Sequence, residues 1–247
     1  MHLLIVVPAR IASSRLPGKP LRRLAGEPLI RVVCRAALQL DSAATVVVAS
    51  DDARVLRAAQ PLGARGVLTD PRHASGTERV AEVAARPEFA GADVVVNVQG
   101  DLVGVSPRLV AAAVARVASG DPVGTVGCAL GAREALDPHR VKVVVDGSGR
   151  ALRFARRLPA SVAWECDVRV LEHIGIYAYT PQALARWVRL PPVPEEQSEG
   201  LEQLRPLTHG VAIGVGRVID GGFMSIDTED DLARAEAALA APHGGTA

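Results

Sequence analysis

Apolar runs alternate with amphipathic segments through the first half of the chain. The apolar runs predict buried strands at residues 3–7, 44–49, 66–68, 94–98 and 123–130. Between these runs, apolar positions that recur at helical spacing predict helices at residues 28–40, 52–62, 75–85 and 106–119. Strands that alternate with helices in this way predict an α/β fold whose first half contains a parallel sheet.

The second half of the chain has an antiparallel pattern. Residues 141–146 and 151–155 flank the turn Gly147-Ser148-Gly149 and predict a hairpin. The remaining expected elements are a loop at 164–168, a strand at 172–179, a helix at 198–208, a strand at 212–215, and a helix at 229–239 capped by Thr228. We therefore expect one principal domain with a small antiparallel part.

Composition and charge narrow the set of partners. A formal net charge of +1 over 247 residues gives no global field that would attract nucleic acid or an anionic membrane, so we expect neither. The cysteines, Cys34, Cys128 and Cys166, are scattered and odd in number, which favours reduced thiols. The sequence has no secretion-signal pattern and no uninterrupted apolar stretch of roughly 18 residues. These features predict a cytoplasmic protein.

The first apolar run ends in a loop that carries three cations. Arg10, Arg15 and Lys19 lie close together in the sequence, beside the small residues Ser13 and Ser14. Open α/β sheets bind ligands at the carboxyl ends of their strands, and clustered cations with accessible backbone N–H groups suit a polyphosphate. The spacing matches neither the P-loop nor the Gly-x-Gly-x-x-Gly fingerprint. A solvated basic loop is the alternative interpretation of this segment.

Two further polar motifs lie at the ends of predicted elements. Ser75-Gly76 opens a predicted helix, where a small polar start can cap the helix and face an anion. Gln99-Gly100-Asp101 follows the strand at 94–98 and places a carboxylate at the carboxyl edge of the sheet. Both motifs are expected near the basic loop.

Over nearly its whole length the sequence resembles the bacterial CMP-Kdo synthetases, the 3-deoxy-manno-octulosonate cytidylyltransferases. The matching stretches are Pro8-Ala9-Arg10, residues 14–21, residues 75–79, residues 97–101, residues 141–144, residues 173–177, residues 201–205 and residues 226–232. The resemblance implies a Rossmann-like nucleotidyltransferase sheet with helices on both faces and a small antiparallel subdomain for dimerisation and acceptor binding. It also implies transfer of CMP from CTP to an acidic sugar, with release of pyrophosphate, by a homodimer.

The resemblance assigns roles to particular residues. The catalytic set that it implies is Arg15, Lys19, Asp101 and Asp227, of which Asp101 and Asp227 would hold Mg²⁺. The nucleotide-binding set is Pro8, Ala9, Arg10, Ser13, Ser14, Lys19, Ser75, Gly76, Thr77, Gln99 and Gly100. The acceptor-binding set is Gln99, Arg156, His173, Tyr177, Glu202 and Gln203. Within a single domain, about 1–130 would bind CTP, about 131–215 the acceptor and the second subunit, and about 216–247 would supply Asp227 and the last helix.

The sequence departs from the family beside the expected metal site. Leu102 and Val103 stand where the family usually has Glu-Pro, and Ala155 stands where a Ser commonly precedes the pocket Arg. A less polar neighbourhood leaves the acceptor open between Kdo, a related sugar acid and a phosphonate such as phosphonoformate. A non-catalytic nucleotide-sugar-binding protein is the alternative from another class.

Overall fold

The chain is organised around a nine-stranded mixed sheet, in a computed structural model that describes residues 1–13, 15–131, 133–158, 169–219 and 222–240. Strand β1 (Leu3–Pro8) lies at its centre with all six residues buried. It pairs in parallel with β4 (Thr45–Ser50) on one side and β6 (Val94–Val98) on the other, and β5 (Arg65–Leu68) extends the parallel part beyond β4. The apolar runs at 3–7, 44–49, 66–68 and 94–98 therefore form parallel strands, as the pattern predicts, whereas the run at 123–130 pairs with none of them.

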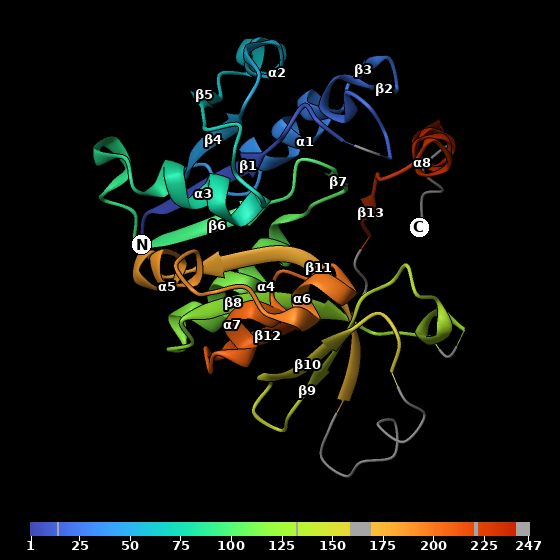
Figure 1. Cartoon of the computed structure of the whole chain (residues 1–247). Coiled ribbons are helices and arrows are strands. Elements are labelled where there is room, and N and C mark those ends of the chain that lie inside the picture. The colour runs from blue at the N-terminus through green and yellow to red at the C-terminus, as the bar shows by residue number, and fades with distance from the viewer. Residues whose placement is uncertain (14, 132, 159–168, 220–221, 241–247) are drawn as a thin grey trace, which may run out of the picture.

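The long strand β11 (Arg169–Tyr179) joins the parallel part to the antiparallel part. It runs antiparallel to β6, to β8 (Val123–Cys128) and to β9 (Lys142–Val145). Strand β10 (Ala151–Ala155) completes the predicted hairpin with β9 and forms one edge of the sheet. Figure 1 shows this hairpin extending away from the parallel strands. The last strand of this sheet, β12 (Ile213–Val218), pairs in parallel with β8.

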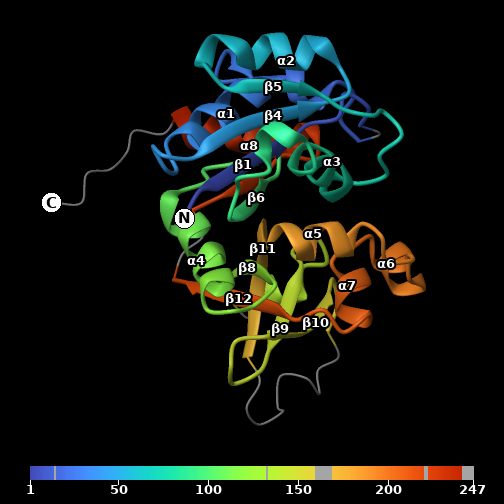
Figure 2. The same cartoon turned by 90° about the vertical axis from the view of Figure 1, so that its left-hand side faces the viewer.

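Helices cover both faces of the sheet because alternate residues of the central strand face opposite sides. Leu3, Ile5 and Val7 belong to one buried cluster, whereas Leu4 and Val6 belong to the other. The first cluster contains residues of α1 (Leu29–Leu38), α2 (Ala53–Ala59), α4 (Pro107–Ala118) and α8 (Glu229–Ala240). The second contains residues of α3 (Gly76–Ala84), α5 (Pro181–Trp187) and α7 (Leu204–Thr208). In Figure 2, α4 lies on one side of the sheet and α5 and α7 lie on the other, which confirms the expected α/β class.

Two short ladders lie outside the main sheet. Strand β2 (Arg23–Leu24) pairs with β3 (Glu27–Pro28), just before α1. Strand β7 (Leu102–Val103) pairs antiparallel with β13 (Met224–Ser225). The second ladder brings the chain that precedes α8 next to the end of β6.

The predicted helix at 198–208 is wrong as a single element. The chain forms α6 (Pro194–Glu199) and then α7, and Gly200 ends α6 in the left-handed conformation with φ of 63°. A residue without Cβ adopts that conformation at little cost, so Gly200 is a natural helix stop. Glu202 and Gln203 therefore lie in the turn between two helices.

Some other elements differ from the sequence pattern. Helix α5 was not predicted, β8 ends at Cys128 instead of residue 130, and β12 continues to Val218. The 3-10 helices are η1 (Lys19–Leu21), η2 (Gln60–Leu62), η3 (Pro87–Phe89) and η4 (Glu134–Leu136). The loop predicted at 164–168 lies outside the described residues. Across the described ranges, every helix is too short or too polar to cross a lipid bilayer.

Candidate active site

A cleft opens where the carboxyl ends of β1 and β6 meet the start of α3 and the turn between α6 and α7. Predicted site residues that line it are Pro8, Ala9, Arg10, Ser13, Arg15, Lys19, Ser75, Gly76, Gln99, Gly100, Asp101, Glu202, Gln203 and Asp227. The structure thus brings most of the predicted nucleotide residues and three of the predicted acceptor residues to one surface. Ser14 lies outside the described residues.

The floor of the cleft depends on a close approach between two strand ends. Gly100 donates its backbone N–H to the carbonyl oxygen of Pro8 at 3.2 Å. A Cβ at position 100 would lie 2.6 Å from that same oxygen, so only glycine fits without a shift of the backbone. This contact places Asp101 beside the loop that follows β1.

Buried residues hold the basic loop in place from below. Asp51 accepts the backbone N–H of Ile11 at 3.0 Å and pairs with the buried guanidinium of Arg79 at 3.3 Å. Ser13 Oγ accepts the N–H of Leu16 at 3.3 Å, and the Leu16 side chain is fully buried. The loop therefore presents its outer cations from a fixed backbone.

Lys19 connects the two carboxylates that were predicted to hold a metal. Its Nζ lies 2.5 Å from Asp101 Oδ2 and 3.0 Å from Asp227 Oδ1, and Arg15 Nη2 also lies 3.0 Å from Asp227 Oδ1. Burial lowers the pKa of Lys19, but the charges and hydrogen bonds of Asp101 and Asp227 outweigh it and raise the pKa above its ordinary value. The ammonium is therefore held in its charged form at the mouth of the cleft.

Asp227 reaches this position through the small ladder of β7 and β13. Ile226, the next residue after β13, donates its N–H to the carbonyl of Asp101 at 3.0 Å. At the start of α8, Asp231 Oδ2 accepts the N–H groups of Asp227 and Thr228 at 3.0 and 2.8 Å, and Thr228 Oγ1 accepts the N–H of Asp231 at 3.2 Å. This reciprocal cap fixes the backbone that carries Asp227.

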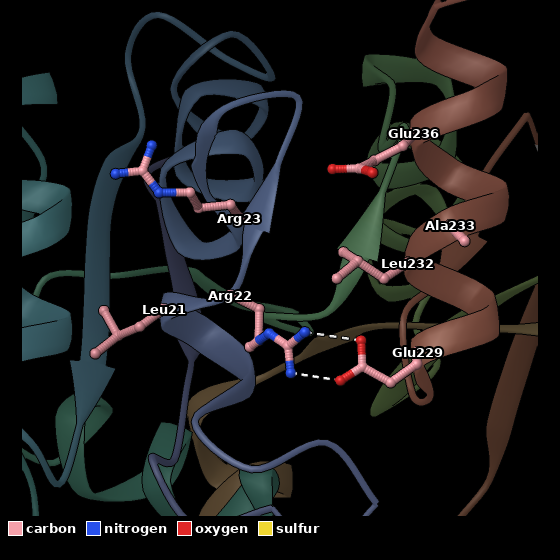
Figure 3. A pocket seen from close by; sticks show the side chains of 7 residues that line it. All are labelled: Leu21, Arg22, Arg23, Glu229, Leu232, Ala233 and Glu236. Carbon is pink, nitrogen blue, oxygen red and sulfur yellow. Dashed lines mark hydrogen bonds and ion pairs between the residues drawn. The ribbon is translucent and has the colours of Figure 1, made fainter.

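A second contact connects the Lys19 segment to α8. Arg22, directly after η1, donates two hydrogen bonds to Glu229, at 2.5 and 2.7 Å. Figure 3 shows this bidentate pair across a shallow pocket between residues 21–23 and α8. The pair joins the two segments that supply Lys19 and Asp227.

The carboxylates fit a magnesium ion that shares its ligands with a phosphate. No group of three or more potential metal-ligating side chains occurs within the described part of the chain, so the protein does not offer an all-protein cage there. Mg²⁺ is commonly held by one or two carboxylates together with water and substrate phosphates. Asp101 and Asp227, joined through Lys19, supply that kind of donor set.

The opposite wall of the cleft carries amide and carboxyl groups. Ser75 caps α3 by accepting the N–H of Glu78 at 3.2 Å, so Gly76 begins the helix directly beside Gln99. A Cβ at position 76 would lie 3.2 Å from Gln99 Oε1. Glu202 and Gln203 face the cleft from the turn between α6 and α7.

Four predicted site residues do not line this cleft: Thr77, Arg156, His173 and Tyr177. Arg156 is tied to the backbone, since its Nε donates to the Glu199 carbonyl at 2.8 Å and its N–H to Glu199 Oε2 at 3.1 Å. Thr77 is 1% exposed and gives its hydroxyl to Glu202. The roles assigned to these residues stay predictions.

His173 and Tyr177 lie in an aromatic cluster beneath the cleft. The His173 ring lies 5.0 Å from the ring of Phe154 and 5.4 Å from that of Tyr177. Thr125 Oγ1 donates to the Ile176 carbonyl at 2.8 Å and lies 3.0 Å from His173 Nε2, an arrangement in which Nε2–H donates to Thr125. Burial lowers the pKa of His173 to about 3, so the ring is neutral at physiological pH.

Several cleft residues were not assigned from the sequence. His73 bonds Glu82 at 2.7 Å and holds the segment before Ser75 against α3. Arg205 lines the cleft but forms a bidentate pair with Glu196 at 2.6 and 2.8 Å, which joins α7 to α6. The supporting role of Arg79 could have been inferred from its place in the motif at residues 75–79. No local sequence pattern predicts the pairs His73–Glu82 and Arg205–Glu196.

Comparisons with known proteins agree with this geometry. The sequence matches the family described as Cytidylyltransferase over residues 4–213. It is 47% identical over 243 residues to a 3-deoxy-manno-octulosonate cytidylyltransferase of Gemmatimonas aurantiaca, covering 95% of this chain and 93% of the relative. It is 43% identical over 246 residues to the protein of that name from Methylococcus capsulatus, covering 94% of each chain.

Solved structures show the same relationship. The structure of a CMP:2-keto-3-deoxy-manno-octonic acid synthetase complexed with CTP has a TM-score of 0.86 at 39% identity, covering 97% of this chain and 99% of that one. A putative glucose-1-phosphate thymidylyltransferase from Bacillus anthracis, at 15% identity and a TM-score of 0.63, shares the fold. The fold and the cleft thus define a nucleotidyltransferase enzyme. The chain belongs to the cytidylyltransferase family and, within it, to the CMP-Kdo synthetases.

Proposed function

We propose that this enzyme transfers CMP from CTP to Kdo, with release of pyrophosphate. The observation that carries the proposal is the meeting of Lys19, Asp101 and Asp227 at one end of a cleft whose other end carries Gln99, Glu202 and Gln203. One cleft therefore offers charged groups for a triphosphate and hydrogen-bonding groups for a hydroxylated acid. The named activity of the relatives supports the same reaction.

Positioning and charge neutralisation are the main demands of phosphoryl transfer. Arg10 and Arg15 are exposed at the cleft, and Lys19 keeps its charge, so these three side chains bind the triphosphate. Asp101 and Asp227 would hold Mg²⁺, which would supply charge neutralisation at the α-phosphate. The attacking oxygen of the acceptor is directed along the line of the breaking bond by the groups on the opposite wall.

Gln99, Glu202 and Gln203 bind the acceptor at the cleft surface, and Arg156, His173 and Tyr177 lie behind or beside them without lining the cleft. The departures from the family lie outside the cleft lining: Leu102, Val103 and Ala155 are 4%, 3% and 2% exposed and pack in the core. Leu102 and Val103 form the β7 ladder with β13. Leu102 and Val103 therefore do not line the cleft in this chain, and the named activity of the relatives favours Kdo over a phosphonate.

A pyrophosphate-release assay tests the proposal directly. With CTP and Mg²⁺, Kdo is expected to turn over at a rate ordinary for an enzyme, about 1 s⁻¹ or faster, while phosphonoformate reacts far more slowly. If phosphonoformate turns over and Kdo does not, the proposal that Kdo is the acceptor is wrong and phosphonoformate takes its place. CTP binding without release of pyrophosphate from any acid would favour a non-catalytic nucleotide-sugar-binding protein.

We also propose that the enzyme is a homodimer that uses the hairpin of β9 and β10. Strand β10 is an edge of the sheet, and its residue Leu152 is 53% exposed. Large exposed apolar side chains at a sheet edge commonly mark an interface. Analytical ultracentrifugation should give a dimer for the wild type and a monomer for Leu152→Asp; a wild-type monomer would contradict the proposal.

A further inference from the structure

A group of buried polar side chains lies directly behind the acceptor wall of the cleft. Thr77, Asn97 and Tyr179 are 1%, 0% and 0% exposed, and they belong to α3, β6 and β11. Glu202 lies in front of them and lines the cleft. Burying a polar group without a hydrogen-bond partner lowers the stability of the fold. Three buried polar side chains close together therefore indicate a role other than packing.

The central contact of this group joins distant parts of the chain. Thr77 donates its hydroxyl hydrogen to Glu202 Oε1 at 2.7 Å, across 125 positions in the sequence. The other carboxyl oxygen, Oε2, is buried and finds no hydrogen-bond partner within the described ranges. Thr77 therefore fixes one oxygen of Glu202, while the second oxygen is buried without a protein partner among the described residues.

The surroundings of Thr77 support a role beyond packing. The Tyr179 hydroxyl lies beside Thr77 and Asn97 but forms no hydrogen bond of normal geometry, and both amide atoms of Asn97 are likewise unpaired among the described residues. The hydroxyl of Thr77 is also not needed to cap α3, because Ser75 already does so. The hydrogen bond to Glu202 is thus the one hydrogen bond of normal geometry that the structure gives the Thr77 hydroxyl among the described residues.

We propose that Thr77 is a positioning residue that holds Glu202 in the orientation required to bind the acceptor. Thr77 touches neither substrate and acts through Glu202. The inference rests on the proposed function in so far as Glu202 is taken to contact the acceptor. The sequence predicted that Thr77 binds the nucleotide. The proposed role is different: Thr77 links helix α3, whose start faces the nucleotide, to the turn between α6 and α7 that carries Glu202.

The charge of Glu202 is consistent with this role. Burial raises the pKa of Glu202, although the hydrogen bond of Thr77 and the nearby Ser75 side chain oppose the rise. A larger share of the neutral carboxyl reduces its repulsion of an anionic acceptor and provides an O–H that can donate to it. The two oxygens of a neutral carboxyl differ, since one carries the proton and the other only accepts. The orientation of the Glu202 carboxyl therefore decides which oxygen faces the acceptor.

Two substitutions at one position separate positioning from packing. Thr77→Val keeps the shape of the side chain and removes the hydroxyl, whereas Thr77→Ser keeps the hydroxyl. We expect Thr77→Val to raise the KM for the acceptor about tenfold, which corresponds to about 1.4 kcal/mol, with the Kd for CTP unchanged within a factor of about two. Thr77→Ser should stay within about threefold of the wild type in both quantities. Equal effects of the two substitutions, or an equal loss of CTP affinity, would overturn the proposal.

A double-mutant cycle tests whether Thr77 acts through Glu202. In the Glu202→Gln background, Thr77→Val should add little to the loss of kcat/KM for the acceptor, because the two residues form one unit. Independent losses that multiply would contradict the proposal. Thermal unfolding of every variant checks that the fold is retained.

Amide hydrogen exchange gives a readout that needs no acceptor. Thr77→Val should speed exchange at residues 201–205, where the acceptor turn lies, and leave exchange in β1 unchanged, while Thr77→Ser should match the wild type. Identical exchange in all three proteins would show that Thr77 does not order the turn. If wild-type enzyme turns over none of the acids, the proposed function fails, and the exchange experiment still decides the positioning role.

Discussion

The two walls of the cleft are built in different ways. On the nucleotide wall, Lys19, Asp101 and Asp227 are 16%, 26% and 32% exposed and meet directly at the ends of loops. On the acceptor side, polar residues such as Lys142 and His173 are buried and are bound by backbone carbonyls or other side chains. Substitutions in the first wall are therefore expected to change binding and turnover, whereas substitutions of Lys142 and His173 are expected to change stability.

The largest effect is expected at the carboxylate pair. Asp101→Asn and Asp227→Asn should each lower kcat about 10³-fold, or about 4 kcal/mol in activation free energy, with little change in thermal unfolding because both side chains lie at the surface of the cleft. If they share one metal, the double variant should be scarcely slower than either single variant. Steady-state kinetics at saturating Mg²⁺ measures this, and losses that multiply independently would contradict a shared metal.

The next effect concerns Lys142, which is fully buried in β9. Its Nζ donates to the carbonyl oxygens of Asp137, Arg140 and Arg156, the last two at 2.9 and 2.7 Å. Lys142→Met keeps the apolar stem and leaves these carbonyls unpaired, so the free energy of unfolding should fall by about 3 kcal/mol.

Urea unfolding measures the loss, with Arg153→Met as the matched control. Arg153 is an exposed cation on the neighbouring strand β10, and its replacement should change stability by less than about 0.5 kcal/mol. CTP affinity should be unchanged in both variants. A Lys142→Met protein as stable as its control would show that the buried ammonium is not required by the fold.

A smaller effect on binding is expected at Lys19. Lys19→Ala removes a charged contact to the triphosphate and should weaken CTP binding by roughly 1.5–3 kcal/mol, or one to two decades. Titration calorimetry measures this loss. Unchanged affinity would mean that Lys19 serves only to join Asp101 and Asp227.

The smallest effect is the pH dependence that His173 gives to stability. The folded-state pKa is lowered by burial to about 3, so between that value and the ordinary pKa the unfolded chain binds a proton that the folded chain does not. The contribution of the neutral His173 ring to stability is fully present above the pKa of His173 in the unfolded chain. It is lost as the pH falls from that value toward the lower pKa of the folded state.

This linkage predicts a difference between two proteins. At pH 5 the His173 contribution should have fallen by about 2 kcal/mol, so the wild type should lose that much more stability between pH 7.5 and pH 5 than His173→Asn. Urea unfolding at both pH values measures the difference. Parallel pH profiles for the two proteins would show that the ring is protonated in the folded state.

Most of the nucleotide wall could be predicted from the sequence. The apolar run of β1, the basic loop after it and the end of β6 are each local patterns, and parallel strands bring their carboxyl ends to one edge. The resemblance to the CMP-Kdo synthetases then selected Asp227, whose distance from Asp101 in the sequence gave no local signal. In the structure both carboxylates contact Lys19, and their shared role with a metal stays a prediction.

The acceptor wall was decided by tertiary structure. The break at Gly200 and the bond between Thr77 and Glu202 join segments whose own patterns do not specify one another. A local pattern fixes which face of a strand or helix is apolar, because that depends on the backbone period alone. Which buried polar group meets which partner depends on how the elements pack, so the nucleotide loop could be recognised in the sequence while the positioning of Glu202 could be seen only in the fold.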